Sequence, residues 1–381
     1  MSEDGALAAS GNLLANDSDV DTSTVLTVAA PGDYVGTYGT LTVAQDGSYS
    51  YALANDSAIV QALREGEVVS DVFAYAATDG TTSTPAVLTV TITGTNDDPV
   101  TADDAASVGE NAALAASGNL LANDSDVDTG TVLTVSAPGE YVGTYGTLTV
   151  AQDGSYSYAL ANDSSIVQAL REGEIVSDVF AYAASDGITT TPAQLTVTIT
   201  GQNDAPVTAN DAGSVGEDGT LAATGNLLAN DGDVDSGTVL TVSAPGGYVG
   251  AYGTLTLAQD GSYSYALAND SAIVQALREG EVVSDVFAYA ASDGITTTPA
   301  TLTVTITGKN DAPVAAADVA NVQEDGTIAA SGNLLANDSD VDTDTVLAVS
   351  APGDYAGTLS IEPEKGRARQ LPWRVRVLPF R

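Results

Sequence analysis

A long internal repeat constrains the fold of this chain of 381 residues more than any other feature. The hexapeptide Asn-Leu-Leu-Ala-Asn-Asp begins at Asn12 and recurs three more times, each time after 107 residues. The repeats are near-copies, because residues 28–97 and 135–204 differ at only nine of 70 aligned positions. Such similarity implies recent duplication, which alters length and valency sooner than chemistry. We therefore expect tandem domains of one kind.

The phase of the repeat sets the domain boundaries. Two copies are complete, whereas the first lacks the segment equivalent to 207–215 and the last keeps only its first three strands, so both ends of the chain are interpreted as cuts. The copies are residues 1–95 (copy one), 96–202 (copy two), 203–309 (copy three) and 310–361 (copy four), followed by a tail over residues 362–381.

The tail differs sharply from the copies in charge. Residues 1–361 carry 49 acidic and 4 basic residues, whereas the tail has a net charge of +4. We interpret this break as a frameshift or assembly edge, and a genuine basic tail that completes the sandwich is the alternative. A three-strand remnant cannot offset an ordering cost of roughly 1–2 kcal/mol per residue. We therefore expect residues 310–381 to be mobile and cut by proteases at Lys365, Arg367 and Arg369.

Apolar and polar residues alternate with period two within each copy, which is typical of half-buried strands. One short helix is predicted over residues 164–171, between a capping Asp163 or Ser164 and Gly173. Seven strands in about a hundred residues favour an all-β fold of immunoglobulin-like sandwiches. In copy three the predicted strands cover residues 207–215, 221–229, 239–242, 254–257, 263–267, 282–290 and 301–307.

An odd number of strands that run alternately up and down carries the chain in at one end of a sandwich and out at the other. We call these the proximal and the distal end of each copy. Copies in tandem are then expected to form a rod that grows by roughly 40 Å per copy.

Composition removes several classes of function. The chain contains no His and no Cys, which excludes Ser-His-Asp and Cys-His catalysis as well as zinc sites of the usual kind. The formal charge of −41 would repel nucleic acid and anionic membrane surfaces, so we expect neither as a partner. No segment approaches the roughly 18 apolar residues of a membrane span, and no targeting signal is visible.

Strand parity assigns each acidic loop to one end of its copy. The loops 230–235 and 292–294 fall at the proximal end, whereas 217–218, 278–281 and 310–311 fall at the distal end. Each junction therefore brings carboxylates together, and these repel by about 1 kcal/mol per close pair in water and by more where solvent is excluded. A single Arg or Lys near each junction does not balance this charge.

Hard oxygen donors suit Ca²⁺, which takes 6 to 8 oxygens. The sequence therefore predicts calcium between consecutive copies, and the alternative is that these loops are only solvated surface. The predicted ligands are Glu110, Asp124, Asp126, Asp128, Glu172, Asp186, Asn203, Asp204, Glu217, Asp231, Asp233, Asp235, Glu279, Asp293, Asn310 and Asp311.

These motifs carry a resemblance to a known family over residues 1–361. Glu217 and Asp233-Val234-Asp235 resemble the early Glu and the Asp-x-Asp loop of cadherin domains, and Arg278-Glu279 resembles their Asp-Arg-Glu motif with Leu277 in place of Asp. Residues 291–294 and 310–313 resemble the Ala-x-Asp-x-Gly element and the linker, which here lacks its leading Asp and second Asn. The copies thus resemble the cadherin-like VCBS repeats of large secreted RTX-type bacterial adhesins. The resemblance implies interdomain calcium, type I secretion and an extracellular or cell-surface location.

Other motifs invite different interpretations. Asp231, Asp233 and Asp235 imitate an EF-hand loop, but its Gly comes one place late and position twelve is Val242. The Asp-Thr-Gly at Asp128 and the Asp-Ser-Gly at Asp235 match an aspartic-protease triplet, yet their spacing is only the repeat period, so parity places them a whole domain apart.

The aromatic residues Tyr156, Tyr158, Phe180 and Tyr182 could form a sugar-stacking platform. Their strand spacing favours a core position, so we predict that they are buried.

The sequence predicts a protein that is not an enzyme. The copies are interpreted as calcium-stiffened spacers of a secreted or cell-surface adhesin that mediates cell adhesion or biofilm attachment, with an unknown surface or matrix ligand bound by domains outside this chain. The alternative is an array of accessory carbohydrate-binding modules from a secreted polysaccharide-degrading enzyme, and a catalytic role ranks third.

Overall fold

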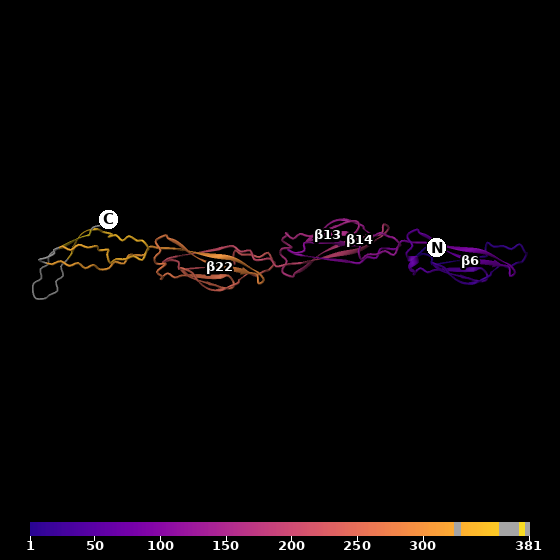
Figure 1. The fold of residues 1–381 in the computed structure, drawn as a ribbon, viewed down its shortest axis with the longest axis horizontal. Helices are drawn as coiled ribbons and strands as arrows, with labels where there is room; N and C mark the ends of the chain where they lie inside the picture. The colour runs from indigo at the N-terminus through magenta and orange to yellow at the C-terminus, as the bar shows by residue number, and fades with distance from the viewer. Residues whose placement is uncertain (324–328, 358–372, 378–381) are drawn as a thin grey trace. The chain divides into compact units, whose positions relative to one another are not determined.

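The computed structural model describes residues 1–323, 329–357 and 373–377 of the chain (Figure 1). Copies two and three are each a sandwich of two four-stranded sheets, so the all-β immunoglobulin-like prediction is confirmed. Copy two contains β8 (Asp104–Gly109), β9 (Ala115–Asn119), β10 (Thr134–Val135), β11 (Gly139–Val142), β12 (Gly146–Val150), β13 (Ser155–Leu160), β14 (Ile175–Ser185) and β15 (Thr190–Thr200). Copy three contains β16 (Asp211–Gly216), β17 (Ala222–Asn226), β18 (Thr241–Val242), β19 (Gly246–Val249), β20 (Gly253–Leu257), β21 (Ser262–Leu267), β22 (Val282–Ser292) and β23 (Thr297–Thr307).

Strand pairing follows one topology in both copies. In copy two, one sheet has the order β10-β14-β15-β8 and the other has the order β11-β12-β13-β9. Only β8 and β15 pair in parallel, from Leu195↔Asp104 to Thr200↔Gly109, whereas the other neighbours are antiparallel. The first and last strands of a copy therefore run in the same direction, as the parity argument predicted.

Each complete copy has eight strands, so the predicted count of seven is wrong. The additional strand is β19 in copy three and β11 in copy two. The two-residue strand β10 pairs with β14, and the chain then passes to the other sheet, where β11 pairs with β12. Because β11 is an edge strand with Val142 82% exposed, its side chains lack the apolar alternation on which the prediction relied.

Several other elements differ from the prediction, chiefly the first strand and the short helix. The strand predicted over 207–215 begins only at Asp211, and Val207 forms an isolated bridge with Gly232 instead. The helix predicted over 164–171 is a series of turns, and only copy one has a single helical turn at this position, α1 (Ala58–Gln61). A segment this short gains too few hydrogen bonds to offset helix nucleation.

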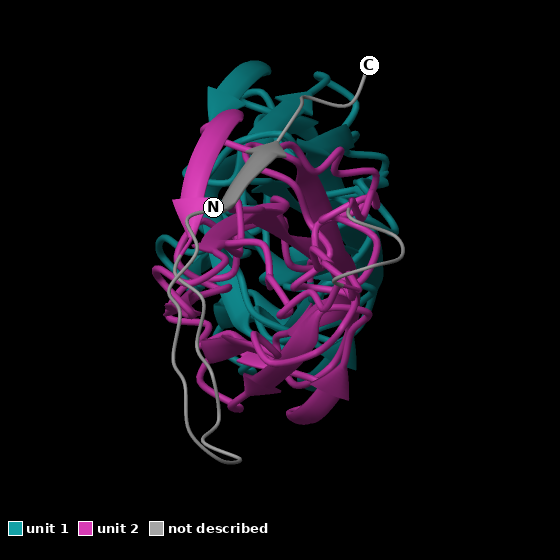
Figure 2. Cartoon of the chain, turned by 90° about the vertical axis from the view of Figure 1, so that its left-hand side faces the viewer, with its two compact units in different colours: residues 1–203 teal, residues 204–381 magenta. Residues whose placement is uncertain are grey.

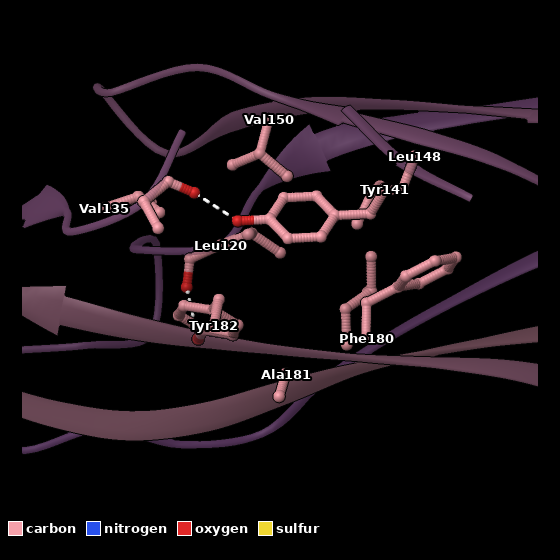
Figure 3. A pocket seen from close by; sticks show the side chains of 10 residues that line it. Leu120, Val135, Tyr141, Leu148, Val150, Phe180, Ala181 and Tyr182 are labelled. Atoms are coloured by element: carbon pink, nitrogen blue, oxygen red, sulfur yellow. Dashed lines mark hydrogen bonds between the residues drawn. The ribbon is translucent and has the colours of Figure 1, made fainter. Parts of the chain in front are cut away.

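The core lies between the inner faces of the two sheets. Tyr158, Phe180 and Tyr182 are 0%, 8% and 9% exposed, and the rings of Tyr158 and Phe180 lie 6.0 Å apart. Figure 3 shows Leu148 and Val150 opposite Phe180 and Tyr182 across this core. The core interpretation of these aromatic residues is confirmed, and Tyr156 packs partly buried against the same cluster.

Copy one has one sheet of four strands and one of three. The three-stranded sheet has the order β2-β6-β7, and Ser2 forms a parallel bridge with Thr93 of β7. The strands are β1 (Ala8–Asn12), β2 (Thr27–Val28), β3 (Gly32–Val35), β4 (Gly39–Val43), β5 (Ser48–Leu53), β6 (Val68–Thr78) and β7 (Ser83–Thr93).

Copy four departs from the sandwich. Its described residues form none of the three strands predicted before residue 350, because the strands that would pair with them are missing from its sequence. Instead β24 (Gly353–Gly357) pairs antiparallel with β25 (Trp373–Val377), a strand inside the segment predicted to be an unrelated tail. The cleavage sites predicted at Lys365, Arg367 and Arg369 lie outside the described residues.

The chain divides into two compact units, residues 1–203 and residues 204–381 (Figure 2). Unit one therefore contains the linker between copies one and two, and unit two contains the linker between copies three and four. The rod of tandem copies stays a prediction.

Candidate metal centre

The acidic loop at the proximal end of copy two lies against the linker that precedes it. The Asp97 backbone N–H donates to Asp128 Oδ2 at 3.2 Å, and the Asp128 N–H donates to Asp126 Oδ1 at 2.8 Å. Three oxygens here are buried without a hydrogen-bond partner, namely Oδ2 of Asp97, Oδ2 of Asp126 and Oδ1 of Asp128. Burying an unpaired carboxylate oxygen costs about 1–3 kcal/mol or more. The loop therefore favours the binding of a cation.

The same arrangement recurs in unit two. The Asp204 N–H donates to Asp235 Oδ2 and the Asp311 N–H donates to Asp342 Oδ2, both at 3.1 Å. Buried oxygens without a hydrogen-bond partner occur again in Asp233, Asp235, Asp311 and Asp342. This recurrence indicates a property of the motif and not an accident of one loop.

A glutamate from the distal end of copy two and of copy three faces the following linker. Glu217 is 0% exposed, and its Oε2 accepts a hydrogen bond from the Lys309 N–H at 2.9 Å. Its Oε1 accepts a hydrogen bond from Gln275 Nε2 at 3.2 Å. Glu110 is held in the same way by Gln168 Nε2 and by the next linker's backbone, both at 3.0 Å.

The glutamines were missed by sequence reasoning. A signal was present, because Gln61, Gln168 and Gln275 recur at one position in an otherwise apolar segment. A neutral amide donor fixes the glutamate without cancelling its charge, so the carboxylate stays available to a cation.

A second glutamate contacts each linker from the Arg-Glu loop. Glu172 Oε2 accepts a hydrogen bond from the Asn203 N–H at 3.0 Å, and Glu279 Oε2 accepts one from the Asn310 N–H at 3.1 Å. The Asn310 side chain also donates to the Asp311 carbonyl. In copies two and three, two glutamates therefore hold the linker backbone.

The loop at Asp186 also reaches the linker in unit one. Asp186 Oδ1 accepts hydrogen bonds from the Ile188 and Thr189 N–H groups at 2.7 Å each, and Oδ2 accepts one from Asn96 Nδ2 at 2.8 Å. Asp293 makes the equivalent turn in copy three. This carboxylate thus shapes its own turn and contacts the linker asparagine.

Asp124 and Asp231 are placed differently from the other predicted ligands. Asp124 Oδ1 accepts a hydrogen bond from the Ala102 N–H at 2.9 Å, and its Oδ2 accepts one from the Tyr182 hydroxyl at 3.4 Å. Asp231 makes the same contacts with Ala209 and Tyr289. Both carboxylates thus accept hydrogen bonds from residues of their own copy.

The boundary between the compact units falls within the linker after copy two. Glu110, Glu172 and Asn203 belong to unit one, and the predicted ligands on the other side, Asp204, Asp233, Asp235 and Asp293, belong to unit two. Within each unit, these residues keep the contacts that the same repeat positions make at the other linkers. The complete ligand set at this linker stays a prediction.

Burial and mutual repulsion disfavour ionisation of Glu3, Asp97 and Asp128. Burial raises the pKa of Glu3, the equivalent of Glu110 in copy one, to about 7, and the charges of Asp97, Asp4 and Asp128 add to the increase. Burial likewise raises the pKa of Asp97 and of Asp128, although the Arg64 guanidinium counteracts part of the increase at Asp128. The cluster thus contains negative charges that repel one another and that a bound cation would stabilise.

Oxygen is the donor type throughout, which fits calcium better than softer metals. Among residues 1–323, 329–357 and 373–377, no three acidic side chains already stand close enough together to hold a metal ion. In that same part of the chain, no helix has the length and apolar character needed to cross a membrane.

Comparisons with known proteins agree with this architecture. The family described as "Bacterial cadherin-like domain" matches residues 1–94, 96–201 and 203–308, and the family described as "Bacterial Ig domain" matches 310–372. The "Calcium-binding lectin RapA2" of Rhizobium johnstonii is 33% identical over 221 residues, which cover 50% of this chain and 89% of the lectin.

Solved structures similar to the chain include two protocadherin fragments. PcdhgB3 EC1-4 has a TM-score of 0.47 at 15% identity, and the match covers 99% of this chain and 89% of the PcdhgB3 chain. Mouse clustered PcdhgC3 EC1-3 has a TM-score of 0.43 at 16% identity, with 79% and 95% covered.

Proposed function

The chain belongs to the bacterial cadherin-like domain family, and on that basis we propose that it is a calcium-stiffened spacer of a secreted or cell-surface bacterial adhesin. The spacer would hold a separate binding domain away from the cell during adhesion or biofilm attachment. The single observation that carries this proposal is the set of buried, unpartnered oxygens of Asp97, Asp126 and Asp128 at the linker between copies one and two.

Calcium would supply positive charge at this linker, and it prefers to bind several oxygen ligands at once. Glu3, Asp97, Asp126 and Asp128 would hold the ion in unit one. Glu217, Asp311, Asp340 and Asp342 are the corresponding groups in unit two. The residues of one copy and of the next would then share one ligand set, which restricts bending at the linker.

The wider setting is part of the same proposal. The motifs that resemble VCBS repeats imply an extracellular location and type I secretion, where the chain would meet calcium only outside the cell. The matched families are cadherin-like and Ig-like repeat domains, which are typically not catalytic. This supports a structural role.

Titration of the whole chain with calcium tests the proposal. We expect heat on binding and a higher free energy of unfolding, by about 2.7 kcal/mol at a calcium concentration 100 times the Kd. Small-angle scattering should show less bending of the chain in calcium than in EDTA. Magnesium at equal concentration serves as the control, because it favours smaller and more rigid octahedral sites. No heat and no gain in stability at millimolar calcium would overturn the proposal.

Carbohydrate binding is the second candidate function, and the calcium-binding lectin relative favours it. Sugar hydroxyls are hard oxygen donors that can complete the coordination of a calcium ion. Among residues 1–323 and 329–357, Tyr355, at 47%, is the only large aromatic side chain that is strongly exposed, so a stacking platform does not support this candidate. A glycan array probed with the whole chain in calcium and in EDTA separates the two candidates, since a spacer should bind no glycan.

A further inference from the structure

A second set of contacts joins consecutive copies without using any carboxylate of the candidate metal centre. In unit one the Thr129 N–H donates to the Ala62 carbonyl at 3.1 Å, and Arg64 Nε donates to the Thr129 carbonyl. Thr129 follows Asp128 in copy two, whereas Ala62 and Arg64 lie just after α1 in copy one. We call these contacts the latch.

The latch recurs in unit two between copies three and four. The Thr343 N–H donates to the Ala276 carbonyl at 3.1 Å, and the Thr343 hydroxyl donates to the same carbonyl at 2.7 Å. Arg278 Nε donates to the Thr343 carbonyl at 2.7 Å. The same backbone carbonyl and the same arginine therefore act at two linkers.

The residue after the threonine differs between the two latches. Gly130 in unit one and Asp344 in unit two both have a left-handed backbone, with φ of +77° and +56°. A Cβ at Gly130 would lie 2.4 Å from Arg64 Nη2, so a side chain at this position meets the guanidinium directly. In unit two the Asp344 carboxylate forms an ion pair with Arg278 Nη2 at 2.5 Å.

We propose that the latch holds consecutive copies together in the absence of any metal ion, and that the residue at position 130 or 344 sets its strength. Gly130 leaves a latch of uncharged acceptors, whereas Asp344 adds an ion pair. The proposal does not depend on calcium binding, because neither Ala276, Thr343 nor Arg278 belongs to the candidate metal centre.

The expected difference between the latches is modest and sensitive to salt. Arg278 and Asp344 are 52% and 77% exposed, and an exposed ion pair shifts an equilibrium by about two- to fivefold. Salt weakens such a pair, since the Debye length falls from about 10 Å at 0.1 M to about 3 Å at 1 M. The hydrogen bonds to the Thr343 and Ala276 carbonyls do not share this sensitivity.

Distance measurements between spin labels in the whole chain test the proposal. The chain has no cysteine, so two introduced cysteines give a unique label pair. Exposed serines at equivalent positions provide one pair across each linker in turn, Ser50 with Ser117 and Ser264 with Ser331.

In EDTA and 50 mM NaCl we expect the closed fraction of the Ser264–Ser331 pair to be about two- to fivefold more favoured with the Asp344 ion pair than without it. The substitution Asp344→Gly should remove this advantage, and 500 mM NaCl should remove most of it. The reciprocal Gly130→Asp, which adds a carboxylate beside Arg64, should narrow the Ser50–Ser117 distribution.

A variant without the arginine addresses the latch as a whole. Arg278→Gln should broaden the Ser264–Ser331 distribution beyond that of Asp344→Gly, since it removes both the ion pair and the bond to Thr343. Equal widths for the wild type, Asp344→Gly and Arg278→Gln in EDTA would overturn the proposal. Failure of calcium to narrow either distribution would instead contradict the proposed function and leave the latch standing.

Discussion

Two aspartates in copy two are equally buried but differ in the way their oxygens are satisfied. Asp178 in the core is 4% exposed and Asp128 at the linker is 6% exposed. Asp178 accepts hydrogen bonds from the N–H groups of Thr144, Tyr145 and Gly146 and from the Tyr158 hydroxyl at 2.7–3.1 Å. Asp128 accepts one backbone hydrogen bond through Oδ2, and its buried Oδ1 has no hydrogen-bond partner.

The difference separates a structural carboxylate from a candidate ligand. Asp178 is complete within its own copy and fixes the turn between β11 and β12, where a Cβ at Gly143 would lie only 2.3 Å from Asp178 Oδ2. Oδ1 of Asp128 lacks a partner, which a bound cation would supply. Burial alone therefore does not mark a carboxylate as a candidate ligand, whereas a buried oxygen without a partner does.

The largest expected effect comes from the substitution Asp178→Ala. It leaves three backbone N–H groups and the Tyr158 hydroxyl without their acceptor, so copy two should lose about 3–5 kcal/mol of stability. The loss should be the same in calcium and in EDTA, because Asp178 has no role at the linker. Hydrogen exchange resolved by copy measures it, with copy three and its intact Asp285 as the internal reference. A calcium-dependent loss would break the distinction between the two aspartates.

The substitution Asp128→Asn should have effects of opposite sign on folding and on calcium binding. In the absence of calcium, the substitution removes a carboxylate whose pKa is raised by burial. The free energy of unfolding should therefore stay unchanged or rise by about 1 kcal/mol. Calcium affinity at this linker should fall at least about tenfold. Calorimetric titration measures the calcium affinity, and chemical denaturation measures the free energy of unfolding. Asp153→Asn is the matched control, because this exposed turn aspartate is satisfied by Ser155.

The smallest expected effect is a pH dependence of stability in EDTA. The pKa of Glu3 is raised to about 7 from an ordinary value of 4.5, so its folded form binds protons more tightly than its unfolded form. Stability from this group is therefore fully present below about pH 4.5 and is lost as the pH rises through 7. Asp128 and Glu217, whose pKa values burial also raises, act in the same direction.

Turn carboxylates such as Asp153 have a lowered pKa through hydrogen bonds from Ser155, so their contribution is lost only below their ordinary value of 3.8. Stability without calcium should therefore increase from pH 8 to pH 5, while the gain from added calcium should shrink over the same range. Thermal unfolding across this range checks both trends. A fall in stability between pH 8 and pH 5 in EDTA would contradict the assignment of raised pKa values to the linker.

Much of this molecule could be predicted from its sequence because the signals were periodic. Alternation with period two located the long strands. Their parity placed Asp235 at the proximal end of copy three and Glu217 at its distal end, and these residues contact the preceding and the following linker, respectively. The edge strand β11 gave no such signal, because only Tyr141 in it is half-buried.

The core carboxylate and the latch could not be predicted, because their partners are distant in sequence. Asp178 lies on the inward face of β14, where alternation alone calls for an apolar residue, and its acceptor role depends on a turn 32 to 34 residues earlier. Arg64 meets Thr129, which lies 65 residues later. Such contacts follow from tertiary packing, which a local pattern does not contain.

The parallel pairing of β8 with β15 has a mechanical consequence for a chain under tension. A pull on the two ends of copy two acts in opposite directions on these neighbouring strands, from Leu195↔Asp104 to Thr200↔Gly109. The hydrogen bonds between them lie across the direction of pull, so they are loaded in shear and must fail together. Copy two is therefore built to transmit force along its length, and its survival under load depends on its unfolding rate and not on its equilibrium stability.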